Sequence, residues 1–114
     1  MNSCLFCKIV RKEIPSQIVY ETDLVLGFID ANPQAPLHIL FVPKKHFNGL
    51  ADLKKEDGSL IVDLLLSASQ VARNHKIEDS GYRLVVNTGK EGGQTVGHLH
   101  LHLLGKRMMT WPPG

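Results

Sequence analysis

Three histidines alternate with leucines in the run His98-Leu99-His100-Leu101-His102-Leu103-Leu104, which holds half of the chain's 6 histidines. In a β-strand, side chains two residues apart share one face, so the imidazoles should line one face and the leucines the other. At about 3.3 Å per residue, His98 and His102 would lie roughly 13 Å apart. A row of imidazoles of this kind is suited to nucleophilic attack, proton transfer or metal binding.

His100, at the centre of this run, is the candidate nucleophile. A nucleophilic imidazole must be unprotonated at one nitrogen while the other donates to a fixed acceptor, and a backbone carbonyl can serve as that acceptor. The glycine-rich segment 87–97 leads directly into the histidine run. Glycines let backbone N–H groups approach an anion closely, although many glycine-rich loops are only turns.

Further candidates lie in the first half of the chain. The Cys4-x-x-Cys7 pair is compatible with a redox pair, a metal site or two buried thiols, and the lack of a βαβ context weakens the redox interpretation. Asp30 follows an apolar stretch, where its carboxylate could accept both hydroxyls of a ribose or could cap the turn before Asn-Pro. His38 could support the site or could be a hydrogen-bonded core histidine.

The elements that must position these residues can be predicted from periodicity. Apolar spacing predicts a short helix over residues 3–12, with Ser3 as its N-cap, and a long helix from about Gly58 to His75. The long helix carries an apolar stripe of Leu60, Ile61, Leu64, Leu65, Ala68, Val71 and Ala72. Strands are predicted over residues 16–21, 25–29, 38–42 and 82–87 and over the histidine run. Only the interval 53–81 could hold a helical crossover, so we expect an antiparallel α+β domain rather than a doubly wound parallel sheet.

Composition narrows the class of protein. A chain of 114 residues can form one domain with a single core, and 43% hydrophobic and 21% charged residues are typical of a soluble globular protein. A net charge of +2 is too small to indicate binding to nucleic acid or to a membrane surface. There is no long apolar span and no signal-peptide pattern, and two closely spaced cysteines cannot form a secreted disulfide framework. We therefore expect a cytoplasmic protein.

The histidine run resembles the signature of the HIT (histidine triad) family, His-φ-His-φ-His-φ-φ with φ apolar, at every position. Other stretches resemble the Hint branch of that family in particular: residues 8–15, Pro33-Gln34-Ala35-Pro36, Pro43-Lys44-Lys45-His46, residues 82–87, Gly92-Gly93-Gln94 and the ending Trp111-Pro112-Pro113-Gly114. The resemblance implies a single HIT domain over residues 1–114, built of a five-stranded antiparallel sheet, one long helix and a short N-terminal helix.

The same resemblance implies a purine nucleoside phosphoramidase, which cleaves the P–N bond of nucleoside 5′-phosphoramidates and releases AMP or GMP and an amine. His100 would attack the α-phosphorus and form a nucleotidyl-histidine, with catalytic support from His102, His38 and Thr95. The implied nucleotide-binding residues are Phe6, Ile9, Phe28, Ile29, Asp30, Ala31, Asn87, Gly93, Gln94, Thr95, Val96, His100, His102 and Trp111. Two other functions stay open: a dinucleoside polyphosphate hydrolase, as in the Fhit branch, and a nucleotide-binding regulatory protein with little turnover.

The resemblance also implies a structural zinc ion bound by Cys4, Cys7, His46 and His98, with no organic cofactor. It further implies a homodimer in which the tail that carries Trp111 reaches the partner's site. Thr95 stands where many Hint proteins have serine. Ile29 stands where some Hint proteins have histidine, and this difference leaves the base preference open.

Overall fold

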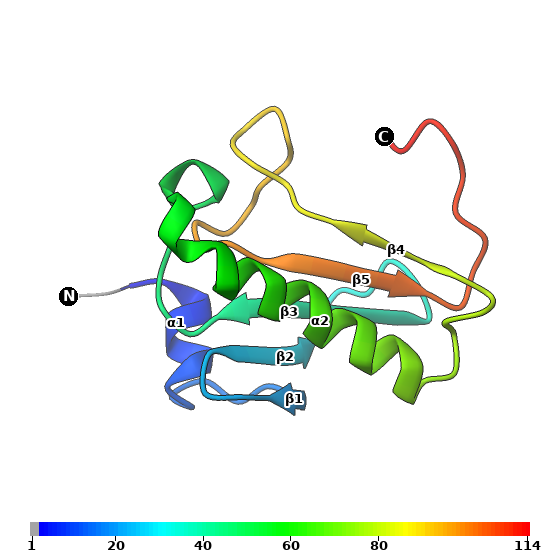
Figure 1. Cartoon of the computed structure of the whole chain (residues 1–114), viewed down its shortest axis with the longest axis horizontal. Coiled ribbons are helices and arrows are strands. Elements are labelled where there is room, and N and C mark those ends of the chain that lie inside the picture. The colour runs from blue at the N-terminus through cyan, green and yellow to red at the C-terminus, as the bar shows by residue number, and fades with distance from the viewer. Residues whose placement is uncertain (1–2) are drawn as a thin grey trace.

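The computed structural model describes residues 3–114 and is built on a five-stranded antiparallel sheet. The strand order is β1-β2-β3-β5-β4, and the long helix α2 lies across one face of the sheet (Figure 1). The elements are α1 (Leu5–Val10), β1 (Ile18–Glu21), β2 (Val25–Ile29), β3 (Leu37–Pro43), α2 (Gly58–Asn74), β4 (Tyr82–Val85) and β5 (Leu101–Gly105), with two short 3-10 turns, Leu50–Asp52 and Lys55–Asp57, before α2. The predicted fold class is therefore confirmed.

The central strands β2 and β3 form because they are nearly continuous apolar runs that are covered on both faces. On the α2 side, a core cluster includes Ile39, Phe41 and Leu103. On the opposite side, a smaller cluster joins Phe6 and Ile9 of α1 to residues of β2 and β3. The sheet is thus packed between a long helix and a short one.

Helix α2 begins at Gly58, as predicted, and ends at Asn74, one residue before the predicted end. Its buried residues are Leu64, Ser67, Ala68, Val71 and Ala72, which recur three or four residues apart and face the sheet. Leu65, which the apolar stripe included, is 46% exposed, because it lies beside that stripe rather than within it. Leu65 is one of several apolar residues of α2 whose side chains are exposed to solvent.

Helix α1 is shorter than the predicted segment 3–12. Its N-cap is Cys4 rather than Ser3, and the Cys4 Sγ accepts a hydrogen bond from the Cys7 N–H at 3.4 Å. The helix ends before Lys12, which takes a left-handed conformation with φ of 65° and so cannot continue it. Both cysteines of the Cys-x-x-Cys pair therefore lie at the start of one helix.

The histidine run is a strand only from Leu101 onward, and this corrects the prediction of a strand from His98. The first residues of the run leave the sheet because the His98 N–H donates to Val96 O and the Leu99 N–H donates to Phe47 O. The leucines nevertheless lie in the core as predicted: Leu99, Leu101 and Leu103 are at most 3% exposed.

Three other strands also differ at their ends from the predictions. The edge strand β1 begins at Ile18 rather than at residue 16, the opposite edge strand β4 ends at Val85 rather than at residue 87, and β3 extends one residue beyond the predicted 38–42 at each end. Within residues 3–114, none of the helices combines the length and the apolar character that crossing a membrane requires.

Candidate active site and metal centre

Strands β3 and β5 pair side by side and bring His38 to the histidine run. Leu40 pairs with His102 and His38 pairs with Leu104 in the antiparallel register. The His38 Nε2 lies 2.9 Å from the His102 Nδ1, although the two residues are 64 positions apart in the chain. The prediction that His38 stands beside the histidine run from a neighbouring strand therefore matches the position of this side chain.

The hydrogen bonds around His38 determine which of its nitrogens carries the proton. The Gln34 backbone N–H donates to the His38 Nδ1 at 3.0 Å, so Nδ1 is unprotonated and Nε2 carries the hydrogen. That Nε2–H donates to the His102 Nδ1, and a carboxylate oxygen of Asp30 lies 3.4 Å from the same Nε2. The single hydrogen on His38 Nε2 therefore belongs to the bond with His102, and the Asp30 carboxylate lies beside that bond.

One hydrogen-bond donor of His102 has no acceptor among residues 3–114. Because its Nδ1 accepts from His38, its Nε2 carries the proton, and this buried atom has no hydrogen-bond partner. Burial lowers the pKa of His102 to about 4, with further lowering by the neighbouring His100 and His38 and partial opposition from Asp30. His102 is therefore a neutral donor at pH 7, and a buried donor without a partner favours an anionic ligand.

His100 has the orientation that a nucleophilic imidazole requires. Its Nδ1 lies 2.7 Å from the backbone carbonyl oxygen of His98 and donates to it, because a carbonyl can only accept. The Nε2 of His100 therefore keeps its lone pair. The ring is held in place by the edge-to-face ring of Phe6, whose centroid is 5.1 Å away, and by the His102 ring at 5.0 Å.

A cavity of about 630 Å³ opens over His100 and His102, a volume in the range of ligand-binding pockets. Its lining includes most of the nucleotide-binding residues predicted from sequence: Phe6, Ile9, Phe28, Ile29, Asp30, Ala31, Thr95, Val96, His100 and His102. The wall is mostly apolar at the end formed by α1 and β2, and polar at the end formed by the histidines and Asp30.

Four predicted nucleotide-binding residues lie outside this lining. Asn87, Gly93 and Gln94 are on the loop between β4 and β5, beyond the cavity wall. Trp111 lies on the C-terminal tail, is 80% exposed, and has its ring 6.0 Å from the Arg83 guanidinium. Figure 1 shows the C-terminal tail at the end of the molecule far from α1, and Trp111 is not among the residues that line the cavity.

Sequence reasoning missed part of the cavity wall. The additional lining residues are Leu5, Ile14, Pro15, Ser16, Gln17 and Leu40. Residues 14–17 join α1 to β1 and belong to no regular element, so periodicity gave no indication of where their side chains lie. Asp30 also has a second role that the turn interpretation anticipated, because its Oδ1 accepts from the Asn32 N–H at 2.7 Å.

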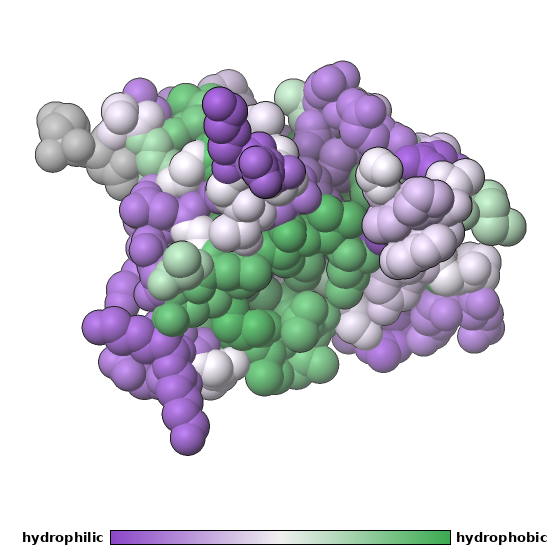
Figure 2. Space-filling model, turned by 90° about the horizontal axis from the view of Figure 1, so that it is seen from above, coloured by the Kyte–Doolittle hydropathy of each residue, from purple (hydrophilic) through white to green (hydrophobic). Residues whose placement is uncertain are grey.

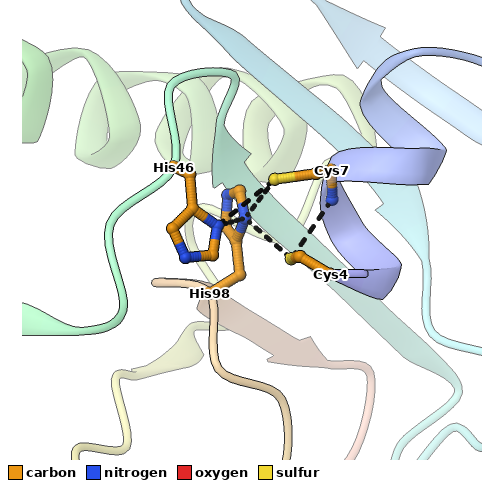
Figure 3. A group of neighbouring side chains, drawn as sticks. All are labelled: Cys4, Cys7, His46 and His98. Carbon is orange, nitrogen blue, oxygen red and sulfur yellow. Dashed lines mark hydrogen bonds between the residues drawn. The ribbon is translucent and has the colours of Figure 1, made fainter. Parts of the chain in front are cut away.

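The four residues predicted to bind metal meet at one point beside the cavity. Figure 3 shows the side chains of Cys4 and Cys7 pointing from α1 toward His46 and His98. The His98 Nδ1 lies 3.3 Å from the Cys4 Sγ and 3.4 Å from the Cys7 Sγ, and the His46 Nδ1 lies 3.2 Å from the Cys7 Sγ. One potential ligand atom from each of the four residues lies within 4.8 Å of the others.

Both imidazoles of this group present a lone pair to its centre. The His98 Nε2–H donates to Pro43 O at 2.9 Å, and the His46 Nε2–H donates to the Asn48 Oδ1 at 2.9 Å, so both Nδ1 atoms are unprotonated. Burial lowers the pKa of His98 and keeps it in this neutral form. The two Nδ1 lone pairs are only 3.1 Å apart, and a shared cation is what relieves such a contact.

The geometry of the group fits a zinc ion. Tetrahedral coordination with two sulfur and two nitrogen ligands would place the ligand atoms about 3.3–3.8 Å apart, close to the separations that the structure shows. The set of two thiols and two imidazoles is a common structural zinc set. We therefore assign Cys4, Cys7, His46 and His98 as residues that could hold zinc.

Comparison with known proteins places the chain in a family. The model of the HIT domain matches residues 11–109, most of the chain. The chain belongs to the HIT family. A relative described as an uncharacterized HIT-like protein, from Synechocystis sp., is 54% identical over 110 residues, which cover 96% of each chain.

Two further comparisons bear on the two sites. A 14 kDa zinc-binding protein of Zea mays is 50% identical over 112 residues, covering 96% of this chain and 87% of the relative. The crystal structure of a HIT family hydrolase from Legionella pneumophila has a TM-score of 0.97 and 48% identity, covering 98% of this chain and all of that one. The similarity to a HIT hydrolase supports a hydrolase, and the zinc-binding relative agrees with the Cys/His cluster.

Proposed function

We propose that this chain is a HIT hydrolase of the Hint branch that cleaves purine nucleoside 5′-phosphoramidates, through a covalent nucleotidyl-histidine on His100. The observation that carries the proposal is the complementary pair of nitrogens at the polar end of the cavity. The Nε2 of His100 has a lone pair, whereas the Nε2 of His102 has a hydrogen and no partner among residues 3–114. A nucleophile beside a donor for a phosphate oxygen is suited to attack on phosphorus.

In the first step, the lone pair of His100 Nε2 attacks the α-phosphorus and the P–N bond to the leaving amine breaks. His102 Nε2–H donates to a non-bridging phosphate oxygen, where negative charge must be stabilised. The hydrogen bond from His38 Nε2–H to His102 Nδ1 keeps this hydrogen on His102 Nε2, and the Gln34 N–H holds His38 in the matching orientation. Thr95 lines the cavity, and its hydroxyl would supply a proton to the departing amine.

In the second step, water attacks the phosphorus of the nucleotidyl-histidine, gives a proton back to the Thr95 oxygen, and releases AMP or GMP. The bond between phosphorus and His100 Nε2 breaks, and the imidazole regains its lone pair. Splitting one displacement into two lowers the barrier that each must cross.

The rest of the cavity suits a nucleoside. The apolar wall that includes Phe6, Phe28 and Ile29 would enclose the base, and the Asp30 carboxylate would accept hydrogen bonds from the ribose hydroxyls. Loop residues Asn87, Gly93, Thr95 and Val96 would lie along the phosphate side. Apolar contact with the base does not by itself separate adenine from guanine, so we expect both to be accepted.

We further propose that the metal at Cys4, Cys7, His46 and His98 is structural zinc, because all four positions of the tetrahedron would be filled by protein and none is open to substrate. No organic cofactor is needed for the proposed chemistry. We propose that the chain acts as a single domain in the cytoplasm, without a nucleic acid or membrane partner.

The proposed assembly is a homodimer. Exposed apolar residues on α2 include Val62, Leu65 and Leu66, and Val86 follows the edge strand β4. Figure 2 shows apolar residues gathered on the face of the molecule that carries these elements. Pairing of two such faces would bury this patch, and it would allow the exposed Trp111 of one chain to approach the cavity of its partner.

A substrate panel tests the proposed function. Purified protein should release AMP from adenosine 5′-phosphoramidate, should act weakly on diadenosine polyphosphates, and should lose turnover of both in the His100→Asn variant. Faster cleavage of diadenosine polyphosphates would contradict the proposed specificity. Tight AMP binding with no turnover of either substrate would instead identify a nucleotide-binding protein.

A further inference from the structure

The loop between β4 and β5 borders the cavity but contains no helix or strand over residues 88–97. Most of its residues are exposed, yet Thr95 and Val96 form part of the cavity wall. A loop with so little packing needs specific hydrogen bonds to hold those two residues in one position.

The side chain of Gln94 supplies such hydrogen bonds. Its Oε1 accepts from the Gly89 N–H at 3.0 Å, and its Nε2 donates to Asn48 O at 2.6 Å and to Val96 O at 3.1 Å. A primary amide nitrogen has two hydrogens, and here both are engaged by backbone carbonyls. Gln94 therefore has no remaining donor for a phosphate oxygen in this conformation.

The loop itself is tightly closed around Gln94. The Gln94 backbone N–H donates to Gly89 O at 3.0 Å, which closes a ring over residues 89–94. A Cβ at Gly92 would stand 2.4 Å from Thr88 O, so only glycine permits this close approach. A compact loop can move as a unit, and its connection to Asn48 fixes where that unit lies.

The anchor for the loop lies next to the metal centre. The Asn48 Oδ1 accepts from His46 Nε2–H, and the Asn48 N–H donates to the Asp52 Oδ2 at 2.8 Å. His46 in turn belongs to the Cys/His cluster. Gln94 thus joins the cavity wall to the segment that carries one of the candidate zinc ligands.

We propose that Gln94 is a positioning residue that holds the glycine-rich loop against the segment 46–49, and that it does not bind the phosphate itself. The inference rests on the proposed function, because it assumes that the cavity takes a nucleotide. It replaces the direct nucleotide-binding role that the family resemblance implied for Gln94. Gln94 acts on the nucleotide only through the positions of Thr95 and Val96 and of the loop backbone.

The test compares Gln94→Ala with wild-type protein, first without nucleotide. Amide hydrogen exchange followed by NMR should show Gly89 exchanging at least about tenfold faster in the variant, because its acceptor is lost. With substrate, kcat/KM should fall about 10- to 100-fold, since displacement of a positioning group by roughly 1 Å costs about 10²-fold. Glu91→Gln, an exposed change on the same loop, is the matched control and should alter neither quantity.

A different pattern would overturn the proposal. If loop exchange in the nucleotide-free variant stayed at the wild-type rate while AMP affinity fell, Gln94 would be a direct ligand. Unchanged exchange together with unchanged kinetics would also overturn it. Gln94→Met, which keeps the side-chain length but has no donors, serves as the second variant if the alanine variant unfolds. Because exchange is measured without substrate, absence of turnover in the wild type would contradict the proposed function and leave the exchange result to decide the role of Gln94.

Discussion

At the scale of single residues, the site depends on which nitrogen of each histidine carries a proton. Backbone groups determine this for the two key imidazoles: His98 O accepts from His100, and the Gln34 N–H donates to His38, which in turn donates to His102. Imidazoles that are fixed by the backbone keep their orientation without any substrate present. The chemistry of the site therefore depends on the fold around it more than on the three histidines alone.

The neutral state of His102 predicts a dependence of stability on pH. Its pKa in the folded protein is about 4, whereas an unperturbed histidine titrates near 6.5. The unfolded chain therefore binds more protons between these values, so the contribution of neutral His102 to stability is complete above about pH 6.5 and is lost as the pH falls toward 4. Asp30, His38 and His100 are the titratable groups that face it.

We expect the melting temperature of wild-type protein to fall between pH 7 and pH 4.5, and to fall less in His102→Asn, which cannot titrate there. Differential scanning calorimetry of both proteins in the same buffers measures this difference. Other groups also titrate in acid, so the contribution of His102 is the difference between the two proteins in how far the melting temperature falls. Parallel curves for both proteins would show that His102 is not held neutral by the fold.

At the scale of elements, α1 connects the metal centre with the nucleotide cavity. Cys4 and Cys7 lie at its start, and Phe6 and Ile9 of the same helix line the cavity. A helix of 6 residues is too short to be stable alone, so its position depends on contacts with the sheet and on the Cys/His cluster.

Removal of a metal ligand should therefore affect stability more than chemistry. We expect one zinc per chain in wild-type protein purified without chelators, and substantially less in Cys7→Ser. The variant should melt several degrees lower and bind AMP more weakly, while turnover at saturating substrate changes less. Elemental analysis and thermal melting measure the first two effects. Wild-type protein with well under one zinc per chain and undiminished stability would contradict a structural zinc site.

Much of the element order could be predicted from the sequence, because apolar periodicity determines the faces of α2, β2 and β3. The alternating leucines also predicted which face of the histidine run is buried, even though the run is a strand only from Leu101. The first half of the run leaves the sheet through a tertiary hydrogen bond from Leu99 N–H to Phe47 O and a local one from His98 N–H to Val96 O, and apolar periodicity predicts neither.

In the candidate sites too, local sequence patterns predicted some residues, whereas others depend on contacts between distant parts of the chain. The metal residues could be proposed only by resemblance to a family, since His46 is 39 residues from Cys7 and 52 from His98. The cavity wall at residues 14–17 was missed because the chain there is irregular. The contacts of Gln94 with Asn48 and Gly89 likewise depend on the closed conformation of a loop, which spacing alone does not specify.

At the scale of the whole molecule, the single chain leaves apolar surface uncovered. Val62 is 52% exposed on α2, and Trp111 on the tail is 80% exposed. Large contiguous apolar patches are uncommon on monomers and typical of interfaces.

We expect sedimentation equilibrium at micromolar concentration to give twice the mass of one chain. Val62→Glu should shift the protein toward monomer, because it places a charge at the centre of the proposed interface. Val19→Glu, at an exposed apolar position on β1, the edge strand opposite β4, is the control and should remain dimeric. A wild-type mass of one chain would rule out the proposed dimer.

The identity of the nucleophile is the central claim, and it can be measured directly. Rapid mixing of wild-type protein with adenosine 5′-phosphoramidate, followed by acid-free quenching and peptide mass spectrometry, should trap an adenylyl group on His100. His100→Ala should form no adduct and should lose at least about 10³-fold in kcat, with AMP affinity and melting temperature little changed. An adduct on another residue, or near-normal turnover by His100→Ala, would contradict the account.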